Sequence, residues 1–180
     1  MGEMIASELV SLIDDATIPG LFGTSPFDDE GVPSRRTVVI ERGRLKSWLH
    51  NSYTARKLGE KTTGNASRGL SGNAGVSNGN LFFAPGTQSP AEIIKGVKRG
   101  LYITELMGSG VNIVTGDYSC GAAGMWIEDG ELAYPVSEIT IAGTFQSMLP
   151  AIDAIGNDLE FRSAIASPTV RIAEMTVSGQ

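Results

Sequence analysis

The sequence predicts an α+β fold that is predominantly antiparallel β-sheet, with two or three short helices. Short segments rich in Val, Ile, Thr and Tyr outnumber helical patterns, and tight turns join neighbouring segments into hairpins. Glycine makes up 23 of 180 residues, against a usual share of about 7%. Because these glycines follow no fixed period, they exclude collagen and indicate many turns and close backbone approaches.

The sequence pattern of the first third of the chain predicts one strand, one hairpin and one helix. The apolar segment 9–13 is expected to form either a buried strand or the end of a helix. The β-branched segment 37–41 is expected to turn back into an antiparallel partner at 44–49. A short helix is expected over 52–58, with its first residue, a serine, as the cap and Gly59 at its end.

The longest glycine-rich segment spans residues 62–80 and carries almost no bulky apolar side chain. A loop of this length inside a compact domain is usually functional or disordered. Four basic residues lie before or within it: Arg56, Lys57, Lys61 and Arg68. Such a loop is a candidate ligand site, because glycine lets backbone amides approach a ligand and arginine binds carboxylates. Few aromatic residues accompany these cations, so an extended peptide is favoured over nucleic acid. A solvated loop remains the alternative.

The second helix has the strongest local signal in the chain. Ser89 is its predicted cap, Pro90 its first residue, and Glu92 completes a capping box. The helix is expected to continue through Arg99 and to end at Gly100. A strand at 81–83 precedes it.

The C-terminal half predicts mainly strands. They are expected at 101–106, 112–119, 125–127, 132–134, 136–142 and 169–177. A bend is expected at 121–124 and a hairpin turn at Asp129-Gly130. Residues 145–155 have helical periodicity, with an interruption at Pro150.

Charge is strongly segregated, although the net charge is only −6. Residues 1–34 carry −7, residues 35–99 carry +9, and residues 100–180 carry −8. One interpretation is that oppositely charged segments pair within one structure, and the other is a basic face for an anionic partner. The acidic run Asp28–Glu30 lacks the spacing of a calcium loop and is expected to be a solvated turn.

One histidine and one cysteine limit the chemistry that the chain can perform. A structural zinc site needs about four such ligands, and one cysteine forms no disulfide within the chain. His50 is expected at the surface and Cys120 as a small buried residue. The segment 117–121 resembles a nucleophile elbow with Ser119 as the nucleophile. Asp117, however, stands at the position where such an elbow needs glycine. No apolar run approaches the roughly 18 residues of a membrane span, so a cytoplasmic protein is expected.

Several ordered motifs together resemble a known family. They are Ile13–Asp15, Pro26–Pro33, Arg36–Thr37, Tyr53–Gly59, Thr63–Gly69, Gly100–Gly108, Thr115–Ser119, Trp126–Val136 and Gly156–Leu159. The sequence resembles the C-terminal part of the TldD/PmbA family, once called modulators of DNA gyrase, and is more similar to the PmbA (TldE) branch. The resemblance implies one TldD/PmbA C-terminal-type domain over 1–180, with the family's N-terminal domain absent, and the start of the chain is expected to reflect truncation.

This resemblance also implies a function. The TldD branch is a cytosolic peptidase that binds zinc through a His-Glu-x-x-x-His helix and a later cysteine, whereas the PmbA branch lacks these ligands and pairs with TldD. Here the segment 161–167, where the later cysteine would stand, contains none. We therefore expect no zinc in this chain and zinc in a TldD-type partner.

The implied partners are a TldD-type subunit or a second copy, together with a peptide substrate; nucleic acid and membrane are not expected. No catalytic residue is predicted, so the chain alone is expected to be inactive. The candidate substrate-binding residues are Thr63, Gly64, Asn65, Arg68, Asp117 and Ser119. Two alternatives remain open, namely an interaction module that binds an anionic partner such as a gyrase-related protein, and a Ser or Cys hydrolase.

Overall fold

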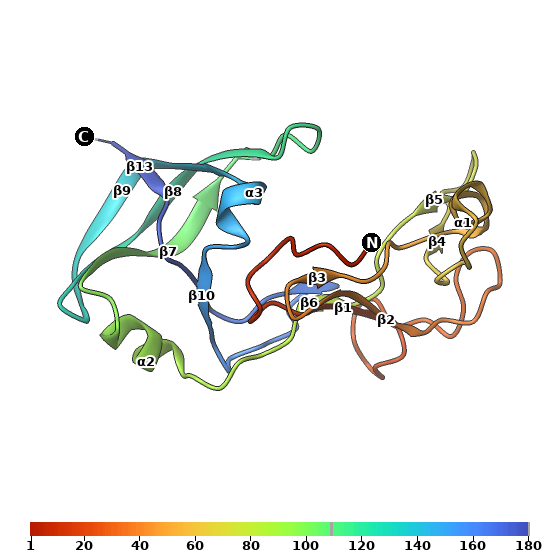
Figure 1. Ribbon diagram of the computed structural model, residues 1–180, viewed down its shortest axis with the longest axis horizontal. Helices are drawn as coiled ribbons and strands as arrows, with labels where there is room; N and C mark the ends of the chain where they lie inside the picture. The colour runs from red at the N-terminus through yellow and green to blue at the C-terminus, as the bar shows by residue number, and fades with distance from the viewer. Residues whose placement is uncertain (109, 180) are drawn as a thin grey trace. The chain divides into compact units, whose positions relative to one another are not determined.

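The computed structural model describes residues 1–108 and 110–179, and its strands are mostly antiparallel, as the sequence predicts (Figure 1). The chain forms two compact units. The first unit consists of Met1–Met4, Val10–Pro85 and Leu159–Pro168, and the second consists of Ile5–Leu9, Gly86–Asp158 and Thr169–Gln180. Each unit is described by itself below.

The first unit is built on a five-stranded sheet with the order β11-β6-β1-β2-β3. Its strands are β1 (Leu12–Asp15), β2 (Arg36–Glu41), β3 (Arg44–Leu45), β6 (Leu81–Phe83) and β11 (Ile165–Ala166). All neighbours are antiparallel except β11 and β6, which run parallel. The central strand β1 therefore joins segments that are far apart in the sequence.

The hairpin predicted near residue 42 is confirmed. Arg42 and Gly43 both have positive φ, 45° and 78°, as a two-residue hairpin turn requires. The returning strand β3 has only two residues instead of the predicted 44–49. The first strand also differs from the predicted 9–13, because it begins at Leu12 and continues through the two buried acids Asp14 and Asp15.

Helix α1 (Ser52–Leu58) begins and ends where the sequence predicts, and Gly59 closes it with a φ of 71°. Its cap is Asn51 rather than Ser52, because the Asn51 side chain accepts a hydrogen bond of 2.8 Å from the Thr54 amide. The glycine-rich segment after it contains a short hairpin of β4 (Ala66–Ser67) and β5 (Gly75–Val76).

The second unit is built on a four-stranded antiparallel sheet with the order β13-β9-β8-β7. Its strands are β7 (Arg99–Met107), β8 (Asp117–Glu128), β9 (Glu131–Thr144) and β13 (Thr176–Ser178). The predicted turn between β8 and β9 is confirmed, since Asp129 and Gly130 have φ values of 48° and 85°. A separate pair consists of β10 (Ile152–Ile155) and β12 (Val170–Ile172).

Helix α2 (Pro90–Lys95) has the predicted capping box at Ser89 and Glu92. The pKa of Glu92 lies below its usual value, because the Ser89 amide and hydroxyl both donate to its carboxylate. The predicted extension to Arg99 is wrong. The helix ends at Gly96, and the Lys98 carbonyl instead accepts the Asp129 amide as the chain enters β7.

Four predictions in the second unit differ from the structure, because long-range pairing overrides local pattern. Residues 121–124 do not separate two strands, since β8 is continuous, although its pairing with β9 shifts register between Ala122 and Gly124. Residues 112–116 form a turn rather than the start of a strand. The predicted helix 145–155 is only α3 (Phe145–Met148), after which β10 pairs with β12, and the predicted last strand is divided into β12 and β13.

The core of the second unit lies on one face of its sheet. Cys120, Ala122 and Ile141 are buried there. Partly buried side chains pack against them: Leu101, Ile103, Tyr118, Ile139 and Met175. Cys120 is therefore a buried, free cysteine, as predicted. No helix in the described part of the chain is both long and apolar enough to cross a membrane.

Gly124 shows why β8 needs small residues. A Cβ atom at this position would lie 2.0 Å from the Tyr102 carbonyl oxygen on the neighbouring strand. We predict that Gly124→Ala lowers the free energy of unfolding by about 1–3 kcal/mol, because the two strands must separate. Urea unfolding measures this loss. The control Gly69→Ala adds a Cβ with no atom within 4 Å, so an equal loss in both variants would contradict the prediction.

Candidate functional site

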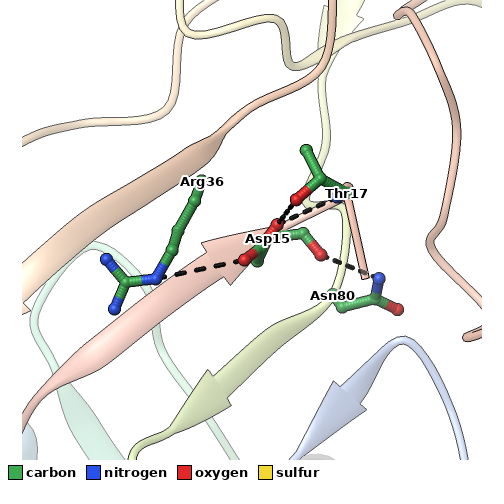
Figure 2. A network of polar contacts seen from close by, with 4 residues as sticks. All are labelled: Asp15, Thr17, Arg36 and Asn80. Carbon is green, nitrogen blue, oxygen red and sulfur yellow. Dashed lines mark hydrogen bonds and ion pairs between the residues drawn. The ribbon is translucent and has the colours of Figure 1, made fainter. Parts of the chain in front are cut away.

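The end of β1 forms a buried polar network in the first unit. The Asp15 carboxylate accepts hydrogen bonds from the Thr17 amide (2.9 Å) and hydroxyl (2.6 Å), and the Arg36 Nε lies 4.0 Å from its other oxygen (Figure 2). Asn80 donates to the Asp15 carbonyl at 2.9 Å. These contacts connect β1, β2 and the segment that leads into β6.

Asp14, 1% exposed, is the acid in the first unit that connects the sheet to the glycine-rich loop. Its two oxygens accept the Asn65 side-chain amide and the Gly79 backbone amide, each at 2.7 Å. Burial raises the pKa of Asp14 above its ordinary value of 3.8, the two hydrogen bonds oppose the rise, and the charge of Asp15 adds to it.

Asn65 is held in one orientation by this network. Its Nδ2 also donates to the Ser77 carbonyl at 3.0 Å, and a carbonyl only accepts. Its Oδ1 therefore faces the other way, where it is buried without a hydrogen-bond partner among the described residues. The sequence analysis selected Asn65 as a substrate-binding residue, and within this unit its side chain serves first to anchor the loop.

The acidic run after β1 is the predicted turn, and its residues Asp29 and Glu30 are exposed, but Asp28 is buried. The buried Asp28 carboxylate accepts three backbone amides, those of Glu30, Val32 and Ala66, each at 2.9 Å. Asp29 accepts the Arg68 amide at 2.7 Å. The local pattern did not reveal the burial of Asp28, because the Ala66 amide that it also accepts lies 38 residues away, in the glycine-rich loop.

The predicted site residues at 63–65 gather around the backbone of His50. The Thr63 and Asn65 amides both donate to the His50 carbonyl at 3.3 Å, and the His50 amide donates to the Thr63 hydroxyl at 2.6 Å. His50 is 5% exposed, which corrects the expectation of a surface residue. Its Nδ1 lies 3.2 Å from the Thr54 hydroxyl, and its Nε2 has no partner in the described part of the chain.

A small polar hollow of about 160 Å³ lies beside these contacts. It is lined by Gly64 and Asn65 among the predicted residues, and by Asp28, Asp29 and several serines. Gly64 has a φ of 75°, and a Cβ there would lie 2.9 Å from the Pro33 carbonyl oxygen, so glycine is required. Thr63 and Arg68 are neighbours in sequence of residues that line the hollow, but they do not line it themselves.

Asp117 and Ser119 belong to the second unit, at the start of β8. Both are exposed. Asp117 accepts the Thr115 hydroxyl at 2.6 Å, and the Ser119 amide donates to the Gly110 carbonyl at 2.8 Å. The backbone at the start of β8 also pairs with β9. Only the side chains of Asp117 and Ser119 therefore remain available to a ligand.

Cys120 also belongs to the second unit, whereas His50 belongs to the first. The Cys120 thiol donates to the Met107 carbonyl at 3.1 Å, and its side chain lies in the apolar core. A nucleophilic serine or cysteine needs a base within hydrogen-bond reach. The hydrogen bonds recorded for Ser119 and Cys120 involve main-chain partners, so they give no support to a hydrolase mechanism.

The sequence matches the family model described as the PmbA/TldA metallopeptidase C-terminal domain over residues 1–179. Metalloprotease PmbA from Escherichia coli O157:H7 is 42% identical over 100% of this chain and 38% of its own length. A Metalloprotease PmbA homolog from Haemophilus influenzae is 37% identical over 99% of this chain and 38% of its length. This chain therefore spans about two fifths of the length of these relatives.

Solved structures have the same fold. A Thermotoga maritima protein, described as a candidate modulator of a DNA gyrase, matches with a TM-score of 0.90 and 39% identity over 99% of this chain and 41% of that chain. TldE from Thermococcus kodakarensis matches with a TM-score of 0.90 and 29% identity over 99% and 42%. The chain belongs to the PmbA/TldD metallopeptidase family and corresponds to its C-terminal domain.

The family description implies a metal, and the side chains of residues 1–108 and 110–179 offer no group that fits one. A catalytic zinc of a peptidase takes three protein ligands. The residues that the structure describes contain no group of three or more His, Cys, Asp or Glu side chains that could hold a metal ion. Buried Asp14 and Asp28 use their oxygens for amide donors of the chain itself. No metal-dependent step is therefore assigned to this domain.

The raised pKa of Asp14 gives stability a defined pH dependence. The folded state holds the Asp14 proton more tightly than the unfolded chain, so the contribution of Asp14 is greatest below about pH 3.8 and is lost as the pH rises through the folded pKa. We predict that the unfolding free energy of the wild type minus that of Asp14→Asn falls as the pH increases over this window. Urea unfolding across a pH series measures the difference, and a constant or increasing difference would contradict it.

Proposed function

We propose that this domain is part of a PmbA/TldE-type subunit that works with a TldD-type zinc peptidase subunit or with a second copy of itself. In this proposal the zinc is held by the TldD-type partner, and this domain contributes to the peptide cleft and the subunit interface in the cytoplasm. The observation that carries the proposal is the donor set: the single histidine and the single cysteine are both buried, and they lie in different units.

The peptide-binding role rests on the glycine-rich loop and on open strand edges. Gly64 and Asn65 line the polar hollow, which offers main-chain and hydroxyl groups of the kind that pair with a peptide backbone. Arg68 is exposed beside it and is suited to a peptide carboxylate. In the second unit, β7 is an edge strand of nine residues, close to the start of β8 where Asp117 and Ser119 lie.

Co-purification with a TldD-type subunit tests this function. We predict that the assembly cleaves a quenched-fluorescence peptide library, that the TldD-type subunit alone does so more slowly and this chain alone not at all, and that metal analysis finds zinc only with the TldD-type subunit. Ser119→Ala is expected to leave any cleavage chemistry intact while weakening peptide binding, which appears in KM rather than in kcat. Stoichiometric tight zinc in this chain alone, or cleavage by this chain alone, would overturn the proposal.

A second function is favoured by the charge distribution. Among the described residues, the one recorded ion pair between the acidic segment 1–34 and the basic segment 35–99 is Arg36 with Asp15. Asp28 and Asp29 bind backbone amides instead of cations. The expectation that the charged segments pair with each other is therefore not supported, and the exposed cations near α1 could serve an anionic partner.

Charge reversal tests this second function. We predict that the double variant Arg56→Glu/Lys57→Glu abolishes salt-dependent binding to an acidic protein or to DNA, measured by titration over a range of salt concentrations. The control Arg35→Glu/Arg42→Glu changes the net charge equally at exposed positions outside α1. Equal loss in both variants would indicate only a net-charge effect, and unchanged binding in the α1 variant would exclude this surface.

A further inference from the structure

The polar hollow of the first unit carries negative charge without a neutralising cation. Asp28 and Asp29 line it, and no lysine, arginine or histidine belongs to its lining among the described residues. Neither carboxylate has a recorded ion pair in residues 1–108 and 110–179. Asp28 is occupied by three backbone amides, whereas the hydrogen bond recorded for Asp29 runs from the Arg68 amide to Oδ2. Oδ1 of the exposed Asp29 therefore remains for a ligand.

Two side-chain amides that line this hollow, those of Asn65 and Asn78, present acceptors to it. Asn65 is 6% exposed, and its Nδ2 donates at 2.7 Å to Asp14, which is not part of the lining. The acceptor end of Asn65 therefore points towards the hollow, and its Oδ1 has no partner within the described part of the chain. The Nδ2 of Asn78 is likewise occupied, because it donates to two main-chain carbonyls at 2.8 and 3.4 Å. Both side chains thus offer an oxygen to a ligand rather than a donor.

The ligand that fits such a lining supplies donors and a positive charge. A primary ammonium group has three N–H donors and no acceptor. The hydroxyls of Ser34, Ser67 and Ser77 also line the hollow, and they are able to accept from it. Calcium, by contrast, takes about six to eight oxygen ligands, and the described residues hold no group of three or more His, Cys, Asp or Glu side chains suited to a metal ion. The lining therefore favours an organic cation over a metal ion.

An aromatic ring at the hollow supports the same assignment. Phe27 belongs to the lining and is 59% exposed. The face of an aromatic ring attracts a cation that lies within about 6 Å of its centre. The hollow has a volume of about 160 Å³, which is below the range of about 300–1,000 Å³ for pockets that enclose a whole small molecule. It therefore accommodates the charged end of a chain rather than a complete ligand.

We propose that the polar hollow binds a primary ammonium group of the peptide, supplied by a lysine side chain or by the peptide N-terminus. The ammonium donates to the Asp29 carboxylate and to the side-chain oxygens of Asn65 and Asn78. The ring of Phe27 lies against the cation, and Arg68, outside the hollow, remains for a carboxylate. The inference rests on the proposed function, because it specifies the peptide chemistry that the same site selects.

Fluorescence anisotropy with three labelled peptides of otherwise identical sequence measures this preference on the 180-residue chain. The first peptide is N-acetylated and contains one lysine, and the second is N-acetylated with norleucine in place of that lysine. The third contains norleucine and has a free N-terminus. We expect the first or the third to bind at least about tenfold more tightly than the second. The peptide that shows the gain identifies the source of the ammonium group as the side chain or the N-terminus.

Two variants place the preference in the hollow. Asp29→Asn removes the charge but keeps an acceptor for the Arg68 amide, and it is expected to reduce the tenfold preference to less than about twofold. Phe27→Leu keeps an apolar side chain without an aromatic face, and it is expected to weaken binding of the ammonium peptide about two- to fivefold. Glu60→Gln is the matched control, because it removes one exposed charge of the same unit outside the lining. If circular dichroism shows that one variant is unfolded, the other variant and the control decide the question.

Equal binding of all three peptides would overturn the inference, and so would a preference that survives in Asp29→Asn. An equal loss in Asp29→Asn and Glu60→Gln would also overturn it, because the effect would then come from net charge. Calcium chloride is added in a parallel titration. If calcium binds with one-to-one stoichiometry and displaces the ammonium peptide, the occupant is a metal ion and the inference is wrong.

These outcomes are independent of the test of the proposed function. If the assembly with a TldD-type subunit cleaves peptides but the ammonium preference is absent, the proposed function stands and this inference falls. If the preference depends on Asp29 but no peptide is cleaved, the hollow is an ammonium site and the peptidase role falls.

Discussion

The first unit depends on buried carboxylates that accept backbone amides. Asp14 accepts the Gly79 amide, and Asp28 accepts the Ala66 amide, so two acids near the start of the chain fix both ends of a loop that follows some 40 to 65 residues later. That loop is rich in glycine and polar residues and has little apolar surface to bury. Hydrogen bonds to charged groups are stronger than neutral ones, so these acids can order a segment that the hydrophobic effect cannot.

The second unit is stabilised in a different way. Long antiparallel strands bury a face of small and aliphatic residues, including Ala122 and Ile141, and glycines allow the strands to approach closely. Outside that core, Ile113 and Val114 are exposed and an apolar pocket is open beside α2. The two units thus offer different surfaces, a polar hollow beside a glycine loop in one and apolar surfaces in the other, which agrees with a domain that contacts both a peptide and another subunit.

Features encoded within a few residues were predicted well. The capping box of α2 and the Asp129-Gly130 turn depend only on residues that are neighbours in the sequence. Features that depend on residues far apart in the sequence were not predicted. The burial of Asp28 was not predicted, because one of its amide partners, Ala66, lies far along the chain. The helical period of 145–155 gave way to pairing between β10 and β12. His50 was expected at the surface because nothing local shows that Thr63 and Asn65 fold over it.

The sequence by itself determined the α+β class, the antiparallel hairpins, the family and the shortage of zinc donors, since composition, turn residues and ordered motifs are properties of the chain alone. Only the tertiary structure decided that Asn65 anchors its loop to Asp14 and that His50 and Cys120 lie in separate units. It also decided which apolar residues remain exposed. Burial and hydrogen-bond partners are set by segments that meet only after folding, so a linear pattern cannot specify them.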